Sequence, residues 1–229
     1  MALSNQIETV EDLQGPAGRL EALLNVGSPD APFSALVCHP HPPSGGTMHT
    51  KVVYQAMKTF HSFGLPVLRF NFRGIGKSAG SYSDGPGEIL DVKAAIDWLD
   101  HRFSTPILLA GFSFGANIGI RAACGDTRVK GVVGLGLPVE SNGRSYSYEF
   151  LSNCTQPKLF VIGSEDPFAP HSAIEHIVET APAPKQLVWV PGAEHFFMGT
   201  PSSPTSKLPV MQAALRRWVE ETFRLKAAG

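Results

Sequence analysis

Short apolar runs alternate with longer amphipathic stretches along most of this chain. The runs are rich in Val, Leu, Ile and Phe, which is typical of strands buried on both faces of a sheet. The last amphipathic stretch repeats apolar residues at helical spacing, at Met211, Leu215, Trp218 and Leu225. We expect strands near 33–38, 65–72, 106–111, 130–137, 158–163 and 186–190, and helices near 47–62, 87–102, 115–124, 146–153, 171–180 and 208–225.

The N-terminal segment has a different pattern. Residues 6–13 and 19–26 flank the turn Gly-Pro-Ala-Gly at 15–18, which predicts an antiparallel hairpin. The alternation of strands and helices after it indicates a mostly parallel sheet with helices on both faces. The chain is therefore expected to form an eight-stranded α/β sheet in a single domain over residues 1–229, because no repeat or linker divides the sequence.

Composition adds limits to this picture. Of the 229 residues, 43% are hydrophobic, which is enough for one large core. The net charge of −1 gives no reason to expect binding to nucleic acid or to an anionic membrane. No signal-peptide pattern opens the chain and no run approaches ~18 apolar residues, so we expect a cytoplasmic protein.

The chain has three cysteines, Cys38, Cys124 and Cys154. Because they are few and odd in number, we expect all three to be reduced and buried. The oligomeric state is left open.

Residues 111–115, Gly-Phe-Ser-Phe-Gly, contain the first candidate catalytic motif. They follow the apolar run 106–110 and precede a stretch of small residues that is typical of a helix. A Gly-x-Ser-x-Gly turn between strand and helix is a nucleophile elbow, which presents the serine hydroxyl on a strained backbone. Gly111 and Gly115 fit this turn because the helix passes so close to the strand that a Cβ would clash. Ser113 is therefore the predicted nucleophile.

A nucleophilic serine needs a base and a third group that orients the base. In this arrangement an acid and then a histidine follow the serine, each in a loop after a later strand. Asp166 and His195 occupy the loops after the last two predicted strands. Glu165 is the alternative acid, and Asp166 is preferred because its shorter side chain is more easily held in one orientation. His195 is preferred over the other histidines because it alone combines the right order with a strand-end loop.

Acyl transfer also requires backbone NH groups aimed at the developing oxyanion. The NH of Phe114 is one expected donor, and the second should come from the loop 39–46. Three residues of that loop are prolines, which have no NH to donate, so His41 is the best-placed donor, with Ser44 as the alternative. The rings of His39 and His41 could equally just pack beneath the elbow. A His-x-His metal site lacks a third ligand at a recognisable spacing, so we expect no metal and no cofactor.

Residues 74–78, Gly-Ile-Gly-Lys-Ser, resemble the end of a phosphate-binding loop. That motif needs glycine where Asn71 stands and a helix directly after the Lys-Ser pair, whereas a loop-like sequence follows here. Nucleotide binding is therefore not expected. Arg73 and Asp91 are expected to form a structural pair, and Glu88 to favour the start of a helix through the helix dipole.

Together these motifs resemble a family of small bacterial α/β-hydrolases, relatives of dienelactone hydrolases and of small lidless serine esterases. The resemblance runs from about Phe33 to His195. It rests on the motifs His-Pro-His-Pro at 39–42, Gly-Gly-Thr-Met at 45–48, Arg-Phe-Asn-Phe-Arg-Gly at 69–74, Gly76, Ser-Ala-Gly at 78–80, Gly87-Glu88 with Asp91, and Gly-Phe-Ser-Phe-Gly at 111–115.

The resemblance implies an α/β-hydrolase fold with a triad and an oxyanion hole. The triad would be Ser113, Asp166 and His195, and the hole would use backbone NH groups near His41 and Phe114. One position departs from the dienelactone hydrolases proper, which carry a cysteine nucleophile. The serine at position 113 therefore argues against dienelactone as the substrate.

The connection between residues 138 and 157 has room for one short helix but not for a large lid. Only a few side chains could then cover an acyl group. The candidates, each of which could equally be a packing residue, are Tyr146, Tyr148, Phe150, Phe168, Phe196 and Met198.

The sequence thus predicts a serine hydrolase that cleaves small-molecule, short-chain carboxylic esters through an acyl-serine intermediate. Thioesterases and peptidases use the same machinery and stay open as alternatives. Outside enzymes, the alternative is a protein of this fold that binds a ligand or partner without catalysis.

Overall fold

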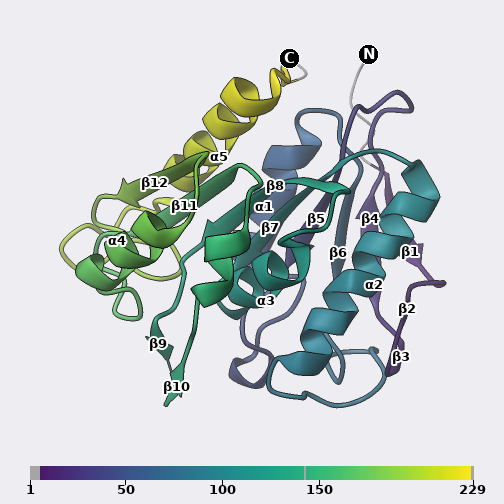
Figure 1. Cartoon of the computed structure of the whole chain (residues 1–229), viewed down its shortest axis with the longest axis horizontal. Coiled ribbons are helices and arrows are strands. Elements are labelled where there is room, and N and C mark those ends of the chain that lie inside the picture. Colours follow the sequence, from purple (N-terminus) through teal and green to yellow (C-terminus); the bar gives the residue numbers. More distant parts are fainter. Residues whose placement is uncertain (1–5, 142, 228–229) are drawn as a thin grey trace.

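The computed structural model describes residues 6–141 and 143–227. A twisted sheet of eight strands runs through the molecule in the order β1-β4-β6-β5-β7-β8-β11-β12 (Figure 1). The first two pairings, β1 with β4 and β4 with β6, are antiparallel and the others are parallel. The strands are β1 (Ile7–Val10), β4 (Ala22–Asn25), β6 (Val67–Phe70), β5 (Ser34–Cys38), β7 (Ile107–Phe112), β8 (Val129–Leu135), β11 (Lys158–Gly163) and β12 (Lys185–Val190).

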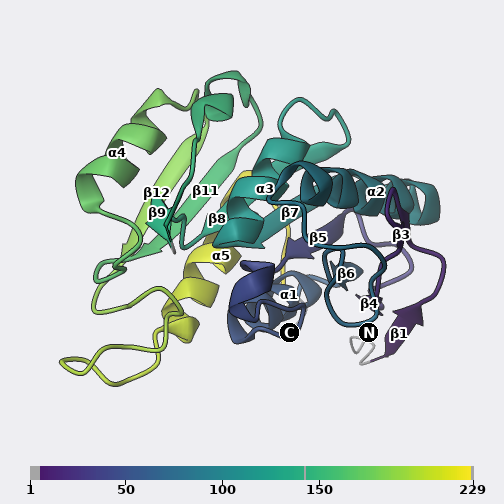
Figure 2. The ribbon, with the colours of Figure 1, turned by 90° about the horizontal axis from the view of Figure 1, so that it is seen from below.

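Helices cover both faces of the sheet, as Figure 2 shows. Helices α2 (Pro86–Phe103), α3 (Phe114–Ala123) and α4 (His171–Thr180) lie on one face, and α1 (Lys51–His61) and α5 (Leu208–Phe223) lie on the other. Each layer closes its own apolar core against the sheet. The parallel strands are buried on both faces, which explains their continuous apolar runs. The predicted fold class is confirmed.

The N-terminal hairpin is also confirmed. Strands β1 and β4 pair in the register Ile7 with Asn25, and β2 (Gln14–Gly15) pairs with β3 (Gly18–Arg19) beyond them. Gly18 has a φ of 113°, a backbone conformation that side chains with a Cβ rarely adopt. The turn glycine therefore sets where the chain reverses.

Two charged contacts fix the loop that leads into α2. Arg73 donates to both oxygens of the buried Asp91, with Nη2 2.7 Å from Oδ1 and Nε 3.0 Å from Oδ2. The Glu88 carboxylate accepts the backbone NH of Gly85 at 2.7 Å, at the first turn of α2. The structural pair expected of Arg73 and Asp91 is confirmed, and Glu88 does act at a helix start.

Among the described residues, the segment between β8 and β11 contains no large lid. The segment forms a small hairpin, β9 (Glu140–Ser141) with β10 (Arg144–Ser145), and a short 3-10 helix, η2 (Glu149–Asn153). The helix expected over 146–153 is therefore shorter than predicted and of the tighter type. Tyr146 and Tyr148 are both buried at a spacing of two, which is the period of an extended chain. Burial of these rings thus delays the helix start.

The expectation of three reduced cysteines is wrong for two of them. Cys124, at the end of α3, forms a disulfide with Cys154, which follows η2, and their Cα atoms are 4.9 Å apart. Cys38 is free and buried. The disulfide closes a separation of 30 residues and ties the segment between β8 and β11 to the helix that begins after Ser113.

This disulfide should be measurable by thiol counting and by unfolding. Denatured protein without reductant should show one reactive thiol, that of Cys38, and three after reduction. Breaking the Cys124–Cys154 disulfide should lower the free energy of unfolding by about 4 kcal/mol, because the unfolded chain regains the conformational entropy of a loop with a 30-residue separation. Denaturant unfolding of the wild type with and without reductant measures the loss. A Cys154→Ser variant is the control, since reductant should leave its stability unchanged; three thiols in the unreduced wild type would contradict the pairing.

Candidate active site

Ser113 stands in the sharp turn between β7 and α3. Its φ of 56° and ψ of −122° lie in a region that costs a residue with a Cβ about 1–3 kcal/mol. Backbone hydrogen bonds hold it there: its NH donates to Leu135 O at 2.9 Å, and its carbonyl accepts from Ala116 NH at 2.9 Å. The sequence run Gly-x-Ser-x-Gly therefore forms a strained turn of the elbow type.

Close packing explains the two elbow glycines. A Cβ on Gly111 would lie 2.2 Å from the carbonyl oxygen of Gly115, so β7 and α3 could not approach as they do. A Cβ on Gly115 would lie 2.3 Å from the carbonyl oxygen of His39. Gly115 is therefore needed for the passage of α3 beneath the loop after β5, a contact that brings this loop next to the elbow.

Three side chains form a hydrogen-bonded chain at the ends of β7, β11 and β12. His195 Nε2 lies 2.9 Å from Ser113 Oγ, and His195 Nδ1 lies 2.7 Å from Asp166 Oδ2. The carboxylate accepts at Nδ1, so the ring carries its proton there and Nε2 is free to accept from the serine hydroxyl. All three residues are less than 10% exposed, at 7% for Ser113, 7% for Asp166 and 4% for His195. This arrangement can transfer a proton from serine to imidazole.

Backbone contacts fix the loops that carry the acid and the histidine. The second oxygen of Asp166, Oδ1, accepts the NH of Phe168 at 2.9 Å, which orients the carboxylate. The NH of Glu165 donates to Ala193 O at 2.9 Å, joining the two loops, while the Glu165 side chain faces solvent. The structure therefore brings Asp166, and not Glu165, to His195.

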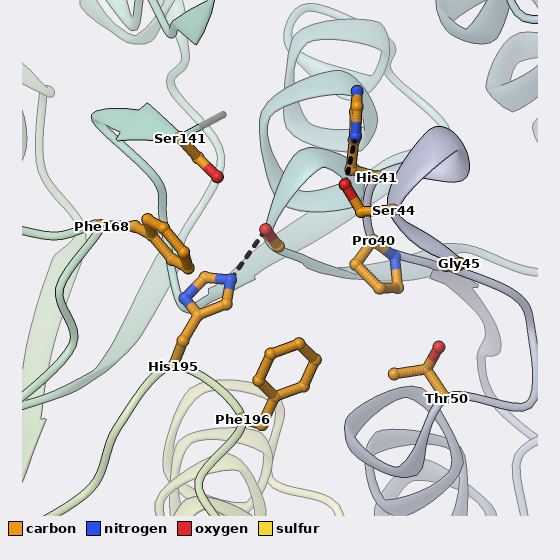
Figure 3. Close-up of a pocket in the computed structure, with 11 residues that line it drawn as sticks. Pro40, His41, Ser44, Gly45, Thr50, Ser141, Phe168, His195 and Phe196 are labelled. Carbon is orange, nitrogen blue, oxygen red and sulfur yellow. Dashed lines mark hydrogen bonds between the residues drawn. The ribbon is translucent and has the colours of Figure 1, made fainter. Parts of the chain in front are cut away.

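Aromatic rings pack around the His195 imidazole. Phe168 and Phe196 flank His195, with ring centroids 4.9 and 5.4 Å away, as Figure 3 shows. The carboxylate of Glu194 accepts the backbone NH groups of Phe196, at 2.9 Å, and Met198, at 2.7 Å. The loop after β12 is thus held in one conformation by its own acidic residue.

The two histidines of the loop after β5 have hydrogen-bonded rings. His39 accepts the NH of Phe72 at Nε2, 3.0 Å away, and donates from Nδ1 to Pro40 O, 2.7 Å away. Burial lowers the pKa of His39 to about 4, so this ring is neutral and fixes the loop beneath the elbow. The His41 ring contacts Ser44 Oγ and Tyr82 OH, each at 2.9 Å.

A cavity of about 360 Å³ opens beside the serine hydroxyl (Figure 3). The residues that line it are Pro40, His41, Ser44, Gly45, Gly46, Thr50, Ser113, Ser141, Phe168, His195 and Phe196. The described lining is apolar, hydroxyl-bearing or imidazole, with no carboxylate, lysine or arginine in it. Such a cavity suits an uncharged group next to the reacting carbonyl.

Only two of the six expected pocket side chains line this cavity, Phe168 and Phe196. Tyr148 is buried and donates to Pro138 O at 2.9 Å, and Tyr146 packs against the Arg144 guanidinium. Phe150 lies beneath the Arg121 guanidinium, and Met198 is 37% exposed in the loop after β12. The segment between β8 and β11 therefore reaches the cavity through a different residue, Ser141.

Ser141 and Thr50 were missed by the sequence analysis. The dipeptide Asn142-Gly143 is a strong hairpin signal, and it could have placed Ser141 at the base of a tight turn. Thr50 carries no such signal. It reaches the cavity because α1 begins directly after the loop 39–46, a placement that only the packing of α1 on the sheet determines.

The fold and the site together define a class. A mostly parallel sheet with a strained serine turn after β7, an acid after β11 and a histidine after β12 is the arrangement of an α/β-hydrolase. Ser113 stands at the carboxyl edge of the sheet, and no large lid covers it within the described residues.

The comparisons with known proteins agree. The chain belongs to the α/β-hydrolase domain family, whose model matches residues 34–222. An uncharacterized protein of Rickettsia prowazekii (strain Madrid E) is 35% identical over 191 residues, which are 80% of this chain and 79% of the relative. The fold is that of the lidless α/β serine hydrolases, and within the described residues no helix is both long and apolar enough to span a membrane.

Solved structures extend the likeness. A serine hydrolase homologue from Coxiella burnetii is 34% identical, with a TM-score of 0.78, over 95% of this chain and 98% of that one. A serine hydrolase without lid from Xanthomonas campestris is 31% identical, with a TM-score of 0.81, over 99% of this chain and 98% of that one. A Pyrococcus furiosus esterase, 17% identical with a TM-score of 0.79 over 94% of this chain and 92% of that one, shares the fold.

Proposed function

We propose that this protein is a serine esterase that hydrolyses short-chain carboxylic esters of small molecules. The single observation that carries the proposal is the hydrogen-bonded chain from Ser113 through His195 to Asp166. A protein that only binds a ligand has no need of all three groups in this order. Support also comes from the family, whose solved relatives include serine hydrolases.

The reaction would proceed through an acyl-serine intermediate. His195 Nε2 takes the hydroxyl proton while Ser113 Oγ bonds to the ester carbonyl carbon, and Asp166 stabilises the imidazolium that forms. The tetrahedral intermediate collapses as Nε2 returns the proton to the departing alcohol. Water then attacks the acyl-serine with His195 again as base, and the carboxylic acid and free Ser113 result.

The oxyanion would be held by the backbone NH groups of Phe114 and His41. Phe114 is the first residue of α3, so its NH points out of the helix start, where the dipole also favours negative charge. Of the two donors considered in the loop 39–46, Ser44 already donates its NH to His41 O at 3.1 Å. This hydrogen bond favours His41 as the second donor.

The shallow cavity should limit the length of the acyl chain. Each methylene adds roughly 0.8 kcal/mol only while it leaves water, and the apolar walls near Ser113 amount to Phe168, Phe196 and Pro40. We expect kcat/KM to peak at short acyl chains, with no jump in rate at an oil–water interface. Rates on aryl esters of rising chain length, above and below substrate solubility, test this. A maximum at long chains, or a sharp rise once droplets form, would overturn it.

Labelling tests the enzyme proposal directly. A fluorophosphonate should modify Ser113 in the folded protein and leave a Ser113→Ala variant unlabelled; absence of labelling in the folded wild type would favour a binding protein instead. A panel of ester, thioester and peptide substrates then separates the reaction types that share this machinery. The highest kcat/KM on a thioester or a peptide would replace the ester assignment.

A further inference from the structure

The His41 ring extends away from the cavity and ends in a polar network. Figure 3 shows the ring directed outward past Ser44. At its far side, His41 Nε2 lies 2.9 Å from the Tyr82 hydroxyl. That hydroxyl donates its own proton to Asp84 Oδ1, 3.0 Å away, so His41 must donate to it from Nε2. Burial and the nearby Arg144 cation lower the pKa of His41, which favours the neutral ring with this tautomer.

Arg144 completes the network from the opposite side. Its Nη1 donates to the Tyr82 hydroxyl at 2.9 Å and forms an ion pair with the Asp84 carboxylate. Its Nη2 donates to the carbonyl oxygen of Asp84 at 3.1 Å. The guanidinium thus fixes both the Tyr82 side chain and the backbone of the loop before α2.

The same guanidinium holds Phe114. Arg144 Cζ lies 5.3 Å from the centroid of the Phe114 ring, a distance typical of a cation–π contact. The Phe114 ring also contacts the His41 ring, with centroids 5.4 Å apart, and the Tyr82 ring, at 6.0 Å. The two residues whose backbone NH groups we assign to the oxyanion hole therefore have their side chains in one cluster.

The cluster joins segments that are far apart in the sequence. Tyr82 and Asp84 belong to the loop before α2, while Arg144 belongs to β10. In the hairpin, Arg144 pairs with Ser141, which lines the cavity. Neither Tyr82 nor Arg144 is among the described residues that line the cavity, so their effect on a bound substrate has to pass through the residues they hold.

We propose that Tyr82, Asp84 and Arg144 are positioning residues that set the geometry of the oxyanion hole by holding the side chains of His41 and Phe114. This inference rests on the proposed function. An oxyanion hole acts only if both NH groups already point at the oxygen, since reorientation during the reaction would consume the stabilisation. The His39 ring fixes the start of the loop 39–46, and the His41 ring is a second attachment point, held by the Tyr82 hydroxyl.

Tyr82→Phe is the decisive variant because it keeps the ring and deletes one hydroxyl. Loss of an entire oxyanion donor costs about 10²–10³ in kcat, so a donor that is present but loosely held should cost about tenfold. We expect kcat/KM for a short ester to fall by about that factor per active site counted by fluorophosphonate titration. Affinity for an alkylboronic acid, whose Ser113 adduct places an oxygen in the same hole, should fall in step.

Tyr146→Phe is the matched control. Tyr146 packs its ring on the same guanidinium, with Arg144 Cζ 5.1 Å from its centroid, but its hydroxyl is not part of the described His41–Tyr82–Asp84 hydrogen bonds. It should keep wild-type kcat/KM and wild-type boronate affinity. Equal losses in both variants would mean that any hydroxyl removed near Arg144 perturbs packing, and would overturn the positioning role.

A double-mutant cycle tests whether the residues act through one route. Arg144→Met keeps apolar contact with Phe114 and removes the hydrogen bonds that Arg144 donates to Tyr82 and Asp84. When it is combined with Tyr82→Phe, kcat/KM should fall no further than in the worse of the two single variants. Effects of substitutions within one hydrogen-bonded network are not additive. Arg144→Lys keeps the positive charge but not the planar guanidinium with its several donors, so it should recover part of the loss in kcat/KM. It also replaces Arg144→Met in the cycle if that variant does not fold.

The outcomes separate the two proposals. Two results would overturn the positioning role and leave the esterase proposal standing, provided that the wild type hydrolyses esters. One is a Tyr82→Phe variant with wild-type kcat/KM. The other is a double variant whose loss in kcat/KM equals the product of the two single losses. A folded wild type that neither reacts with the fluorophosphonate nor hydrolyses any ester, thioester or peptide overturns both.

Discussion

Ser113→Ala is expected to abolish hydrolysis, lowering kcat by about 10⁴-fold or more, as in other triad enzymes. The Ser113 hydroxyl oxygen is the atom proposed to bond to the substrate carbonyl carbon, and it lies 2.9 Å from His195 Nε2. Steady-state rates on a short aryl ester measure the loss. Retention of more than a few per cent of activity would mean that another nucleophile operates.

The same substitution should leave the fold intact. The strained backbone at position 113 is held by the NH and carbonyl hydrogen bonds to Leu135 and Ala116, which an alanine keeps. Denaturant unfolding should therefore show a change of about 1 kcal/mol or less, the size of the one side-chain hydrogen bond that is lost. Ser141→Ala is the matched control, because Ser141 lines the same cavity and lies outside the hydrogen-bonded chain to His195. It should keep most of the activity.

Asp166→Asn is expected to lower kcat by about 10⁴-fold, the size of the effect in the comparable protease case. An asparagine amide can donate to His195 Nδ1, which would move the ring proton to Nε2. His195 could then no longer accept the proton of Ser113. Binding of the ester should change much less than kcat, because the shape of the site is kept.

Glu165→Gln is the control for the acid. Glu165 is adjacent in sequence but its side chain is exposed, and only its backbone NH joins the loop after β12. It should keep nearly full activity. If Glu165→Gln proved the more damaging of the two, the assignment of the acid to Asp166 would be wrong.

Local pattern was enough to predict the framework of the site. The run before Ser113 is apolar because β7 is buried on both faces, and the small residues after it fit α3 against the sheet. Asp166 and His195 could be placed because parallel strands bring their carboxyl ends to one edge, whatever the helices between them do. The order of the residues along the chain and the strand pattern were therefore enough to predict the candidate triad.

Details that depend on contacts between distant segments could not be predicted. Cys124 and Cys154 looked like two more buried thiols, because nothing in their spacing shows that the end of α3 meets the end of η2. Tyr146 and Tyr148 looked suitable for a pocket, yet the hairpin before them turns both rings into packing positions. Aromatic side chains suit a core and a pocket equally well, so composition could not choose.

The sequence by itself determined the fold class, the elbow at Ser113 and the loops that carry its expected partners, because strand period, helix period and turn glycines are local properties. Only the tertiary structure decided which side chains line the cavity, which cysteines pair and what holds the ring of His41. Tyr82 lies 41 residues from His41, and Arg144 lies 62 residues from Tyr82. Contacts over such separations follow from the packing of whole elements, which no short window of sequence contains.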